Sequence, residues 1–247
     1  MRILRAEIGL PPGKNPFFEG QYSPAMTLGL FSPLLARRRP DWPKGSRTTG
    51  FLYYDEALDG GAESPKVSRR LEKFLDSGPP PVVFALGSSA VLAAGEFYRD
   101  SSQAANILGV RAVMIAGKGQ ENRPVAKPSD KIAVFDYLPY SKIFPRAAAV
   151  VHHGGIWTTA QALYAGRAML VAPFSFDQPD NAYRVHRLGV ARIIRPQSYS
   201  AARAAGELKI LLENPQYSKT AEKLAKAVRA ENGQESARNA INEVVEL

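Results

Sequence analysis

Short apolar runs alternate with helix-length segments along the second two-thirds of the chain. Each run has the length of a strand, and several end at a glycine. Near-continuous apolar strands separated by helices are typical of a parallel sheet that is covered on both faces. The pattern therefore predicts an α/β fold, a Rossmann-like parallel sheet with helices on both faces. Its strands are expected at residues 82–86, 111–116, 131–135, 148–152 and 168–172.

Helix boundaries are marked most clearly in the second half of the chain. A helix over residues 179–188 has Pro179 at its first position, Asp180 in its first turn and Gly189 just past its end. These three residues form a complete set of boundary signals. Further helices are expected in the segment ending at residue 108, at 141–146, at 156–165 and from 201 to the C-terminus, where Pro215 interrupts the helix once.

The first 80 residues have a different character, with little sustained periodicity and ten of the 19 prolines. Their clearest pieces are an extended segment at 48–54 and a helix at 67–76, in which Leu71, Phe74 and Leu75 have helical apolar spacing. This segment has too few core residues to form a domain. We therefore expect two parts, residues 1–80 and a folded domain at residues 81–247.

Composition excludes several classes of protein. The chain of 247 residues is 45% hydrophobic and contains no cysteine, so disulfide frameworks and thiolate metal sites are excluded. We expect neither a signal peptide nor a transmembrane helix, because the apolar runs are too short. The absence of cysteine fits a cytoplasmic protein. The net charge of +9 is spread thinly, with Arg37–Arg39 as the only dense run. Nucleic acid is therefore not an expected partner, although weak association with an anionic membrane would suit the charge.

In a parallel sheet of this kind, ligands bind beyond the carboxyl ends of the strands. The first loop there contains Gly87 and Ser88. A glycine lets backbone N–H groups approach a phosphate, and the hydroxyl adds a donor. The same dipeptide also makes an ordinary turn, so this loop by itself fits both interpretations equally.

The second loop runs from His152 through Gly154 and Gly155 to Thr158. Two glycines expose backbone N–H groups where a helix starts, and the helix dipole favours an anion there. Thr158 would alternatively cap the helix. A metal pair formed by His152 and the adjacent histidine is disfavoured, because neighbouring strand residues point to opposite faces. We instead expect the His152 ring to donate to a diphosphate.

The third loop contains Asp177 and Gln178 in front of the helix at 179–188. A carboxylate beside a carboxamide suits the vicinal hydroxyls of a sugar, because the pair supplies both acceptors and donors. A helix cap is the alternative interpretation, and it is about equally compatible with the local sequence.

Together these loops resemble a known signature. His152-His153-Gly154-Gly155, Thr158-Thr159-Ala160-Gln161 and Pro173 with Asp177-Gln178-Pro179-Asp180-Asn181 are similar to the donor site of the bacterial UDP-glycosyltransferases of glycosyltransferase family 1. Asp136-Tyr137-Leu138-Pro139 is similar to the segment that holds uracil there. The resemblance covers roughly residues 80–247. It implies the C-terminal domain of a GT-B fold, with residues 1–80 as a remnant of the N-terminal acceptor domain and its connector.

The resemblance also implies roles for individual residues. Tyr137 and Pro139 would lie at the base, and Asp177 and Gln178 would bind the sugar. The diphosphate would be surrounded by Gly87, Ser88, His152, Gly154, Gly155 and Thr158. No metal and no cofactor are implied, and the UDP-sugar is the donor substrate. Trp157 departs from the family, which usually has a smaller residue there, and we expect its ring to reduce the phosphate pocket rather than to pack outward on Tyr164.

The implied reaction is an inverting, metal-independent transfer of a hexose from a UDP-sugar to a hydroxyl of a lipophilic small molecule. The family's general base comes from the N-terminal domain, so no catalytic residue is assigned here. All three histidines lie in the donor part, and we expect the chain alone to bind donor and transfer little. The alternatives are a non-catalytic donor-binding subunit that works with a separate acceptor-domain chain, and a nucleotide-sugar epimerase, which Asp177 and Gln178 argue against.

Overall fold

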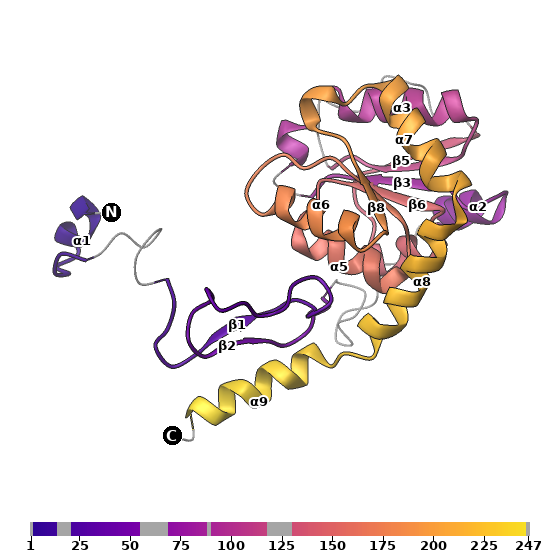
Figure 1. Cartoon of the computed structure of the whole chain (residues 1–247). Helices are drawn as coiled ribbons and strands as arrows, with labels where there is room; N and C mark the ends of the chain where they lie inside the picture. Colours follow the sequence, from indigo (N-terminus) through magenta and orange to yellow (C-terminus); the bar gives the residue numbers. More distant parts are fainter. Residues whose placement is uncertain (1, 14–20, 55–68, 88–89, 118–129, 246–247) are drawn as a thin grey trace. The chain divides into compact units, whose positions relative to one another are not determined.

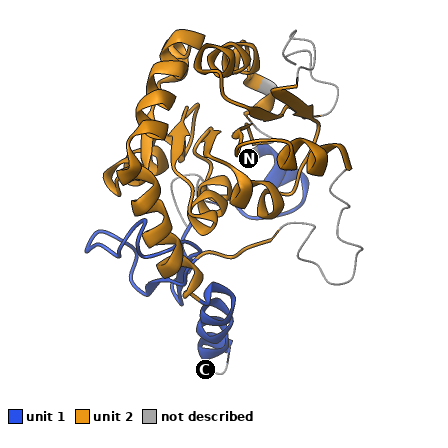
Figure 2. Cartoon of the chain, turned by 90° about the vertical axis from the view of Figure 1, so that its right-hand side faces the viewer, with its two compact units in different colours: residues 1–50, 232–247 blue, residues 51–231 orange. Residues whose placement is uncertain are grey.

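The computed structural model describes residues 2–13, 21–54, 69–87, 90–117 and 130–245. Contacts divide the chain into two compact units, residues 51–231 and residues 1–50 with 232–247 (Figure 2). These limits differ from the boundary after residue 80 that the sequence suggests. Compact units are defined by contacts and not by ancestry, so the assignment of 1–80 and 81–247 stays a prediction.

The larger unit is built on a parallel sheet of six strands (Figure 1). Their order is β5-β4-β3-β6-β7-β8, and every neighbouring pair is parallel. This confirms the predicted α/β fold. The strands are β3 (Val82–Ala85), β4 (Ala112–Ile115), β5 (Ile132–Phe135), β6 (Ala149–His152), β7 (Met169–Val171) and β8 (Ala191–Ile193).

Helices cover both faces of this sheet. On one face, α3 (Phe97–Leu108) packs against α7 (Ala201–Glu213), and on the other α5 (Ile156–Ala165) contacts α4 (Tyr140–Ile143), α6 (Gln178–Arg187) and α8 (Pro215–Arg229). Figure 1 shows α3 and α7 above the strands and α5 and α6 below them. Helix α2 (Arg69–Asp76) precedes the sheet, and short 3-10 turns lie at Val91–Ala93, Phe144–Arg146 and Pro196–Ser198.

Alternation along the strands decides which side chains face which helices. Val82 and Phe84 of β3, with Ala149 and Val151 of β6, belong to a buried cluster that includes Ala104 of α3 and Leu208 of α7. Side chains alternate between faces along a strand. Val150 and His152 therefore point to the opposite face, which α5 covers.

The strand order creates a switch point between β3 and β6. The chain runs outward from β3 through β4 to β5 and then returns to β6 on the other side of β3. Loops leaving the carboxyl ends of β3 and β6 consequently diverge to opposite sides. In open sheets of this type the crevice between two such loops is where ligands bind.

Several expected elements differ in detail. Helix α5 has the expected bounds, and α6 begins one residue earlier than expected, at Gln178. The C-terminal region is interrupted twice, before Pro215 and again between α8 and α9 (Gly233–Val245). Strand β8 was not predicted from the sequence, and of the expected extended segment at 48–54 only Thr48 lies in a strand.

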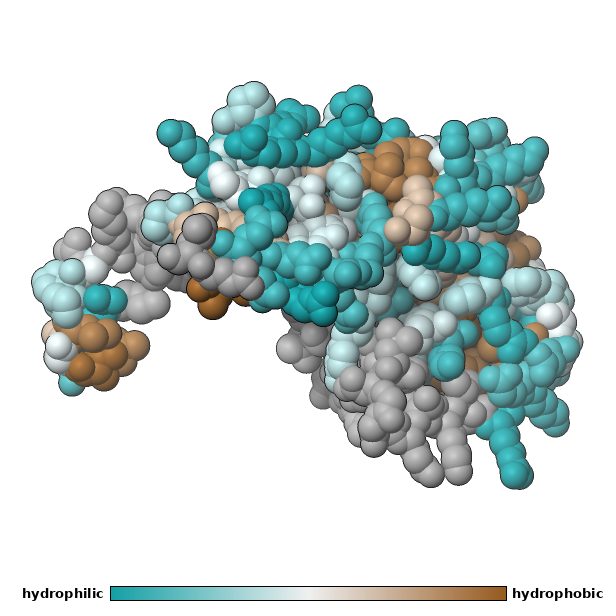
Figure 3. Space-filling model, turned by 90° about the horizontal axis from the view of Figure 1, so that it is seen from below, coloured by the Kyte–Doolittle hydropathy of each residue, from teal (hydrophilic) through white to brown (hydrophobic). Residues whose placement is uncertain are grey.

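The smaller unit contains two short strands, the short helix α1 (Arg2–Glu7) and the longer helix α9. Strands β1 (Thr27–Gly29) and β2 (Ser46–Thr48) pair in parallel, and an ion pair of 2.5 Å joins Arg47 of β2 to Glu243 of α9. Apolar side chains are exposed on α1, including Ile3 and Leu4, and Figure 3 shows this hydrophobic surface. No helix among the described residues is both long and apolar enough to cross a membrane.

Candidate functional site

Two of the three predicted loops meet at the switch point. The backbone N–H of Gly87, which follows β3, donates to Nδ1 of His153, which follows β6, at 3.1 Å. This hydrogen bond ties the first loop to the second. The predicted phosphate ligand Ser88 lies outside the described residues.

His153 occupies the space between two glycines. A Cβ atom added to Gly87 would lie 2.5 Å from Cε1 of the His153 ring, and one added to Gly155 would lie 2.4 Å from its Nε2. Neither position can hold a larger residue unless the ring moves. The ring is 5% exposed, and burial lowers the pKa of His153, with Asp177 acting weakly in the opposite direction. Gly87 and Gly155 thus leave the space that the His153 ring occupies.

His152 lies deeper than its neighbour. Its Nδ1 accepts the N–H of Gly154 at 3.0 Å, and its ring is fully buried. Within the described part of the chain its Nε2 has no hydrogen-bond partner. Burial, assisted by the neighbouring His153, lowers the pKa of His152 to about 3. The contact between His152 and a diphosphate stays a prediction. In the structure the His152 ring is enclosed by protein.

Both histidines are held in the same tautomer. A neutral imidazole whose Nδ1 accepts a hydrogen bond carries its proton on Nε2. The hydrogen bonds from Gly87 and Gly154 therefore assign the proton to Nε2 in His153 and in His152. Each ring can donate at Nε2 and neither has a free basic nitrogen. His153, which lies between the loop glycines, is suited to binding an anion, and neither ring is suited to general base catalysis.

The N-terminus of α5 lacks a side-chain cap. Gly155 is at the N-cap position, and no side chain accepts a hydrogen bond there. The first N–H groups of a helix have no partner within the helix, and the helix dipole makes this end attractive to anions. Thr158, which was considered as a cap, is instead buried, and its side chain is hydrogen-bonded to Tyr140. The hydroxyl of Tyr140 is itself buried, which raises its pKa to about 12.

The same hydrogen bond brings the predicted base-binding segment towards α5. Tyr137 precedes Tyr140 by three residues and is 52% exposed. Pro139 is buried at the N-cap of α4. Tyr140 contacts Thr158 in the first turn of α5, and whether the exposed ring of Tyr137 also reaches that helix end stays a prediction. Trp157, also in the first turn, is 51% exposed, and whether it narrows a phosphate pocket stays a prediction.

The third loop has an internal brace. Oε1 of the buried Gln178 accepts the N–H groups of Phe174 at 2.8 Å and of Ser175 at 3.1 Å. Asp177 is exposed and accepts from Nδ2 of Asn181 at 2.7 Å, and the same nitrogen donates to the carbonyl of Gly154 at 2.9 Å. Asp177 is at the N-cap position of α6, but its side chain accepts no hydrogen bond from the first N–H groups of the helix. The capping interpretation of Asp177 therefore does not apply. Asn181 thereby links the third loop to the second.

Sequence reasoning missed two residues here. His153 was set aside in favour of His152, and Asn181 was given no role of its own. Their importance follows from ring and amide directions, which the sequence does not contain. One signal was available for His153, because a histidine just past a strand end is positioned at the carboxyl edge of the sheet.

Comparison with known proteins decides the family. Residues 105–245, more than half of the chain, match the family model described as erythromycin biosynthesis protein CIII-like, C-terminal domain. The chain belongs to this glycosyltransferase family. The resemblance inferred from the donor-site motifs is therefore confirmed, and so is the C-terminal domain of the GT-B fold.

Individual relatives agree with this assignment. The chain is 35% identical over 236 residues to O-mycaminosyltylonolide 6-deoxyallosyltransferase of Streptomyces fradiae, an alignment that covers 95% of the chain and 53% of that protein. It is 31% identical to a sterol 3-beta-glucosyltransferase of Arabidopsis thaliana, with 83% of the chain and 31% of the relative covered. The chain thus spans about half, or less, of the length of these glycosyltransferases.

Solved structures show the same fold. The kitacinnamycin glycotransferase superposes with a TM-score of 0.75 at 22% identity, covering 98% of this chain and 60% of that one. The glycosyltransferase VinC, solved in complex with dTDP, has a TM-score of 0.60 at 22% identity and covers 70% of this chain and 44% of its own. At these identities the likeness supports the fold alone.

Proposed function

We propose that this glycosyltransferase-family chain binds the nucleotide sugar of an inverting, metal-independent transfer, in which a hexose passes from a UDP-sugar to a hydroxyl of a lipophilic small molecule. One observation carries the proposal. His153 is held between Gly87 and Gly155, and its Nε2 faces the uncapped N-terminus of α5. A ring donor beside free helix N–H groups is an arrangement that suits a diphosphate.

In the proposed reaction the acceptor hydroxyl attacks the anomeric carbon while the bond from that carbon to the diphosphate oxygen breaks. Negative charge then increases on the leaving diphosphate. The backbone N–H groups of α5 and the Nε2–H of His153 stabilise this charge without a metal ion, because they are already oriented in a largely buried setting. The hydroxyl proton passes to a general base outside this set of residues.

The other predicted residues complete the donor site. Gly87, Ser88, Gly154, Gly155, Thr158 and His152 are assigned to the surroundings of the diphosphate, and Tyr137 with Pro139 to the base. Asp177 presents an exposed carboxylate to the sugar hydroxyls. Gln178 uses its oxygen for the backbone of its own loop, so its Nε2 is the atom that would reach the sugar.

No histidine of the chain is suited to be the general base. His152 and His153 have their Nδ1 atoms occupied by backbone donors, and His186 lies in the last turn of α6, at the end of that helix away from the proposed donor site. The chain alone should therefore bind donor and show little transfer. A donor-binding subunit that works with a separate acceptor-domain chain is the alternative, and it predicts full activity only when that partner is added.

Titration calorimetry with UDP, dTDP and ADP tests the nucleotide part. We expect UDP to bind more tightly than ADP, without added metal, and His153→Ala to weaken UDP binding at least tenfold. His186→Ala is the matched control and should leave the affinity unchanged. Equal affinity for UDP and ADP would remove the base from the proposal, and tighter binding of dTDP, the nucleotide present in the VinC structure, would reassign the donor.

The sugar part is tested by comparing UDP-glucose with UDP. Asp177→Ala should weaken UDP-glucose roughly tenfold or more, since a hydrogen bond to a charged group contributes about 1.5–3 kcal/mol. UDP itself should bind as before, because Asp177 is assigned to sugar hydroxyls only. If both ligands lose affinity equally, Asp177 serves the loop and not the sugar.

A further inference from the structure

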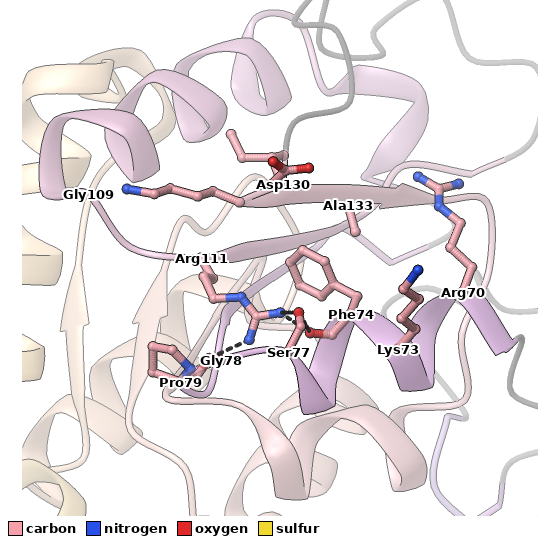
Figure 4. A pocket seen from close by; sticks show the side chains of 12 residues that line it. Arg70, Lys73, Phe74, Ser77, Gly78, Pro79, Gly109, Arg111, Asp130 and Ala133 are labelled. Atoms are coloured by element: carbon pink, nitrogen blue, oxygen red, sulfur yellow. Dashed lines mark hydrogen bonds between the residues drawn. The ribbon is translucent and has the colours of Figure 1, made fainter.

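A second cleft lies at the opposite edge of the sheet, among the residues that precede β3, β4 and β5 (Figure 4). It measures about 700 Å³ and is lined by α2 on one side and by the start of β5 on the other. The donor loops all leave the carboxyl ends of the strands. Most of the cleft's lining residues lie at the amino ends of β3, β4 and β5, and none of them belongs to the loops that follow β3, β6 and β7.

The charges of helix α2 are sorted between its two sides. Glu72 and Asp76 both bind Arg146, Glu72 at 2.8 Å. Arg70 and Lys73, one turn apart, line the cleft. Among the described residues neither of these two cations forms an ion pair, and the Arg70 guanidinium lies over the Phe135 ring at 5.2 Å. The acids of α2 are therefore engaged elsewhere, and two cations are left for the cleft.

The floor of the cleft carries a third cation. The guanidinium of Arg111 lies 4.2 Å from the centre of the Phe74 ring and donates to the carbonyls of Phe74 and Pro79 and to the hydroxyl of Ser77 (Figure 4). All of these acceptors are neutral. Burial accordingly lowers the pKa of Arg111, whose side chain is mostly enclosed. The α2 carbonyl offsets part of this charge, and no carboxylate in the described structure balances the rest.

The remaining lining sets the chemistry of an occupant. Asp130 and Lys131 lie together before β5 and add one negative and one positive charge to the lining. Phe74, Pro79 and Ile132 supply apolar surface. The cleft thus combines a net positive charge from α2 and Arg111 with a partly apolar wall. A dianionic group balances two available cations better than a carboxylate does.

We propose that this cleft is an anion site for a phosphomonoester that is attached to an apolar body. Arg70 and Lys73 bind the phosphate, and the Arg111–Phe74 stack supports the apolar part. The ligand belongs either to the free pool of phosphorylated metabolites or to a lipid head group, which share this chemistry. The site is independent of the nucleotide-sugar function proposed above.

Calorimetry on the full chain with hexyl phosphate tests the site, with inorganic phosphate as the probe that lacks the apolar part. Hexyl phosphate should bind saturably and more tightly than phosphate, and excess UDP should not displace it. The double variant Arg70→Ala/Lys73→Ala should weaken binding roughly five- to tenfold. Lys219→Ala/Lys223→Ala, which removes two exposed charges from α8, is the matched control and should bind normally.

Absence of saturable binding, displacement by UDP, or an equal loss in the α8 control would each overturn the proposal. All four substituted side chains are exposed, so unchanged melting temperatures are expected and should be checked. A second arm measures binding to phosphatidylcholine vesicles with and without phosphatidic acid. Vesicle binding that depends on Arg70 and Lys73 supports a lipid head group, and binding of hexyl phosphate alone supports a free metabolite.

Discussion

The two loops that enter α5 and α6 follow neighbouring parallel strands and precede helices of ten residues each, yet they are built in opposite ways. The loop after β6 turns its side chains inward, with His153 only 5% exposed. The loop after β7 turns them outward: Phe176 is 90% exposed and Asp177 is also exposed. At the donor site proposed above, the β6–α5 loop would therefore offer backbone groups to a ligand, and the β7–α6 loop would offer side chains.

This difference matches what each loop is assigned to bind. A phosphate is recognised by N–H groups in the same way whatever sugar it carries, so a loop of glycines around buried histidines is sufficient. Sugars differ in the arrangement of their hydroxyls, and only side chains can follow such differences. Gln178 supports this arrangement in the β7–α6 loop, because its carboxamide oxygen fixes the loop from within, while Asp177 stays exposed with one carboxylate oxygen bound by Asn181.

In the β6–α5 loop, Gly154 should be the residue that tolerates substitution least. Its φ is +86°, and an added Cβ would lie 2.9 Å from Cγ1 of Val171 and 3.0 Å from the carbonyl of Gln178. Gly154→Ala should therefore destabilise the protein by about 3 kcal/mol, through backbone strain and overpacking together. Chemical denaturation measures this change.

Gly109 supplies the matched control. It also has a positive φ, +66°, but an added Cβ would meet nothing within 4 Å. Gly109→Ala should cost only the backbone strain, about 1 kcal/mol. Equal losses in the two variants would show that Val171 and Gln178 are not packed against Gly154, and the contrast between a tightly packed and an open loop would fail.

Acidification should lower the stability of the protein through the two buried histidines of the β6–α5 loop. Burial lowers the pKa of His152 to about 3 and that of His153 below its usual value. Between pH 6.5 and about 3 the unfolded chain therefore binds more protons than the folded chain, so stability falls as pH falls. Each such histidine contributes a slope of up to about 1.4 kcal/mol per pH unit, or about 2 kcal/mol for His152 between pH 6.5 and 5.

The slope is measured by denaturation at several pH values and compared among variants. His152→Gln removes one buried titrating group and should flatten the dependence on pH, even if it lowers stability overall. His186 is exposed, and His186→Gln should leave the slope as it is. An unchanged slope in His152→Gln would mean that the loss in acid originates elsewhere.

The sequence predicted the elements that physical rules mark strongly. Helix α5 is closed by Gly166 at φ +69°, and α6 has Pro179 near its start and Gly189 past its end. The five predicted strands are mainly apolar runs of five or six residues in the sequence, whereas β8 has Arg192 in the middle of its three residues and has no such run. Such a strand is defined by pairing with β7 and not by its own pattern, so it was missed.

Within the site, sequence could identify the loops but not the directions of their side chains. Gln178 illustrates the limit, since its oxygen accepts two backbone N–H groups of its own loop, and the sequence does not show where this oxygen points. The same applies to His152 and His153. Their alternation predicts opposite directions, but only the contacts with Gly87 and Gly155 show which ring lies at the edge.

The smallest expected effect concerns Phe176, whose φ of +56° is the only positive value at a non-glycine residue in the described part of the chain. A bulky residue in the left-handed region is strained by about 1–2 kcal/mol. Phe176→Gly removes this strain but adds freedom to the unfolded chain, which offsets about 0.4–1 kcal/mol. We expect a net gain of about 0.5 kcal/mol, a rise of roughly 1–2 °C in melting temperature. The control variant Phe176→Ala keeps the Cβ and hence the strain. Because the Phe176 ring is 90% exposed, the melting temperature of Phe176→Ala should match that of the parent protein. Backbone strain at a residue that contributes no stability points to a functional role of its side chain. We expect the Phe176 ring to contact the sugar, so both variants should bind UDP normally and UDP-glucose more weakly. If Phe176→Gly instead lowers the melting temperature, the Phe176 ring stabilises the fold. The β7–α6 loop would then not present its side chains to a ligand, and the contrast between the two loops would fail.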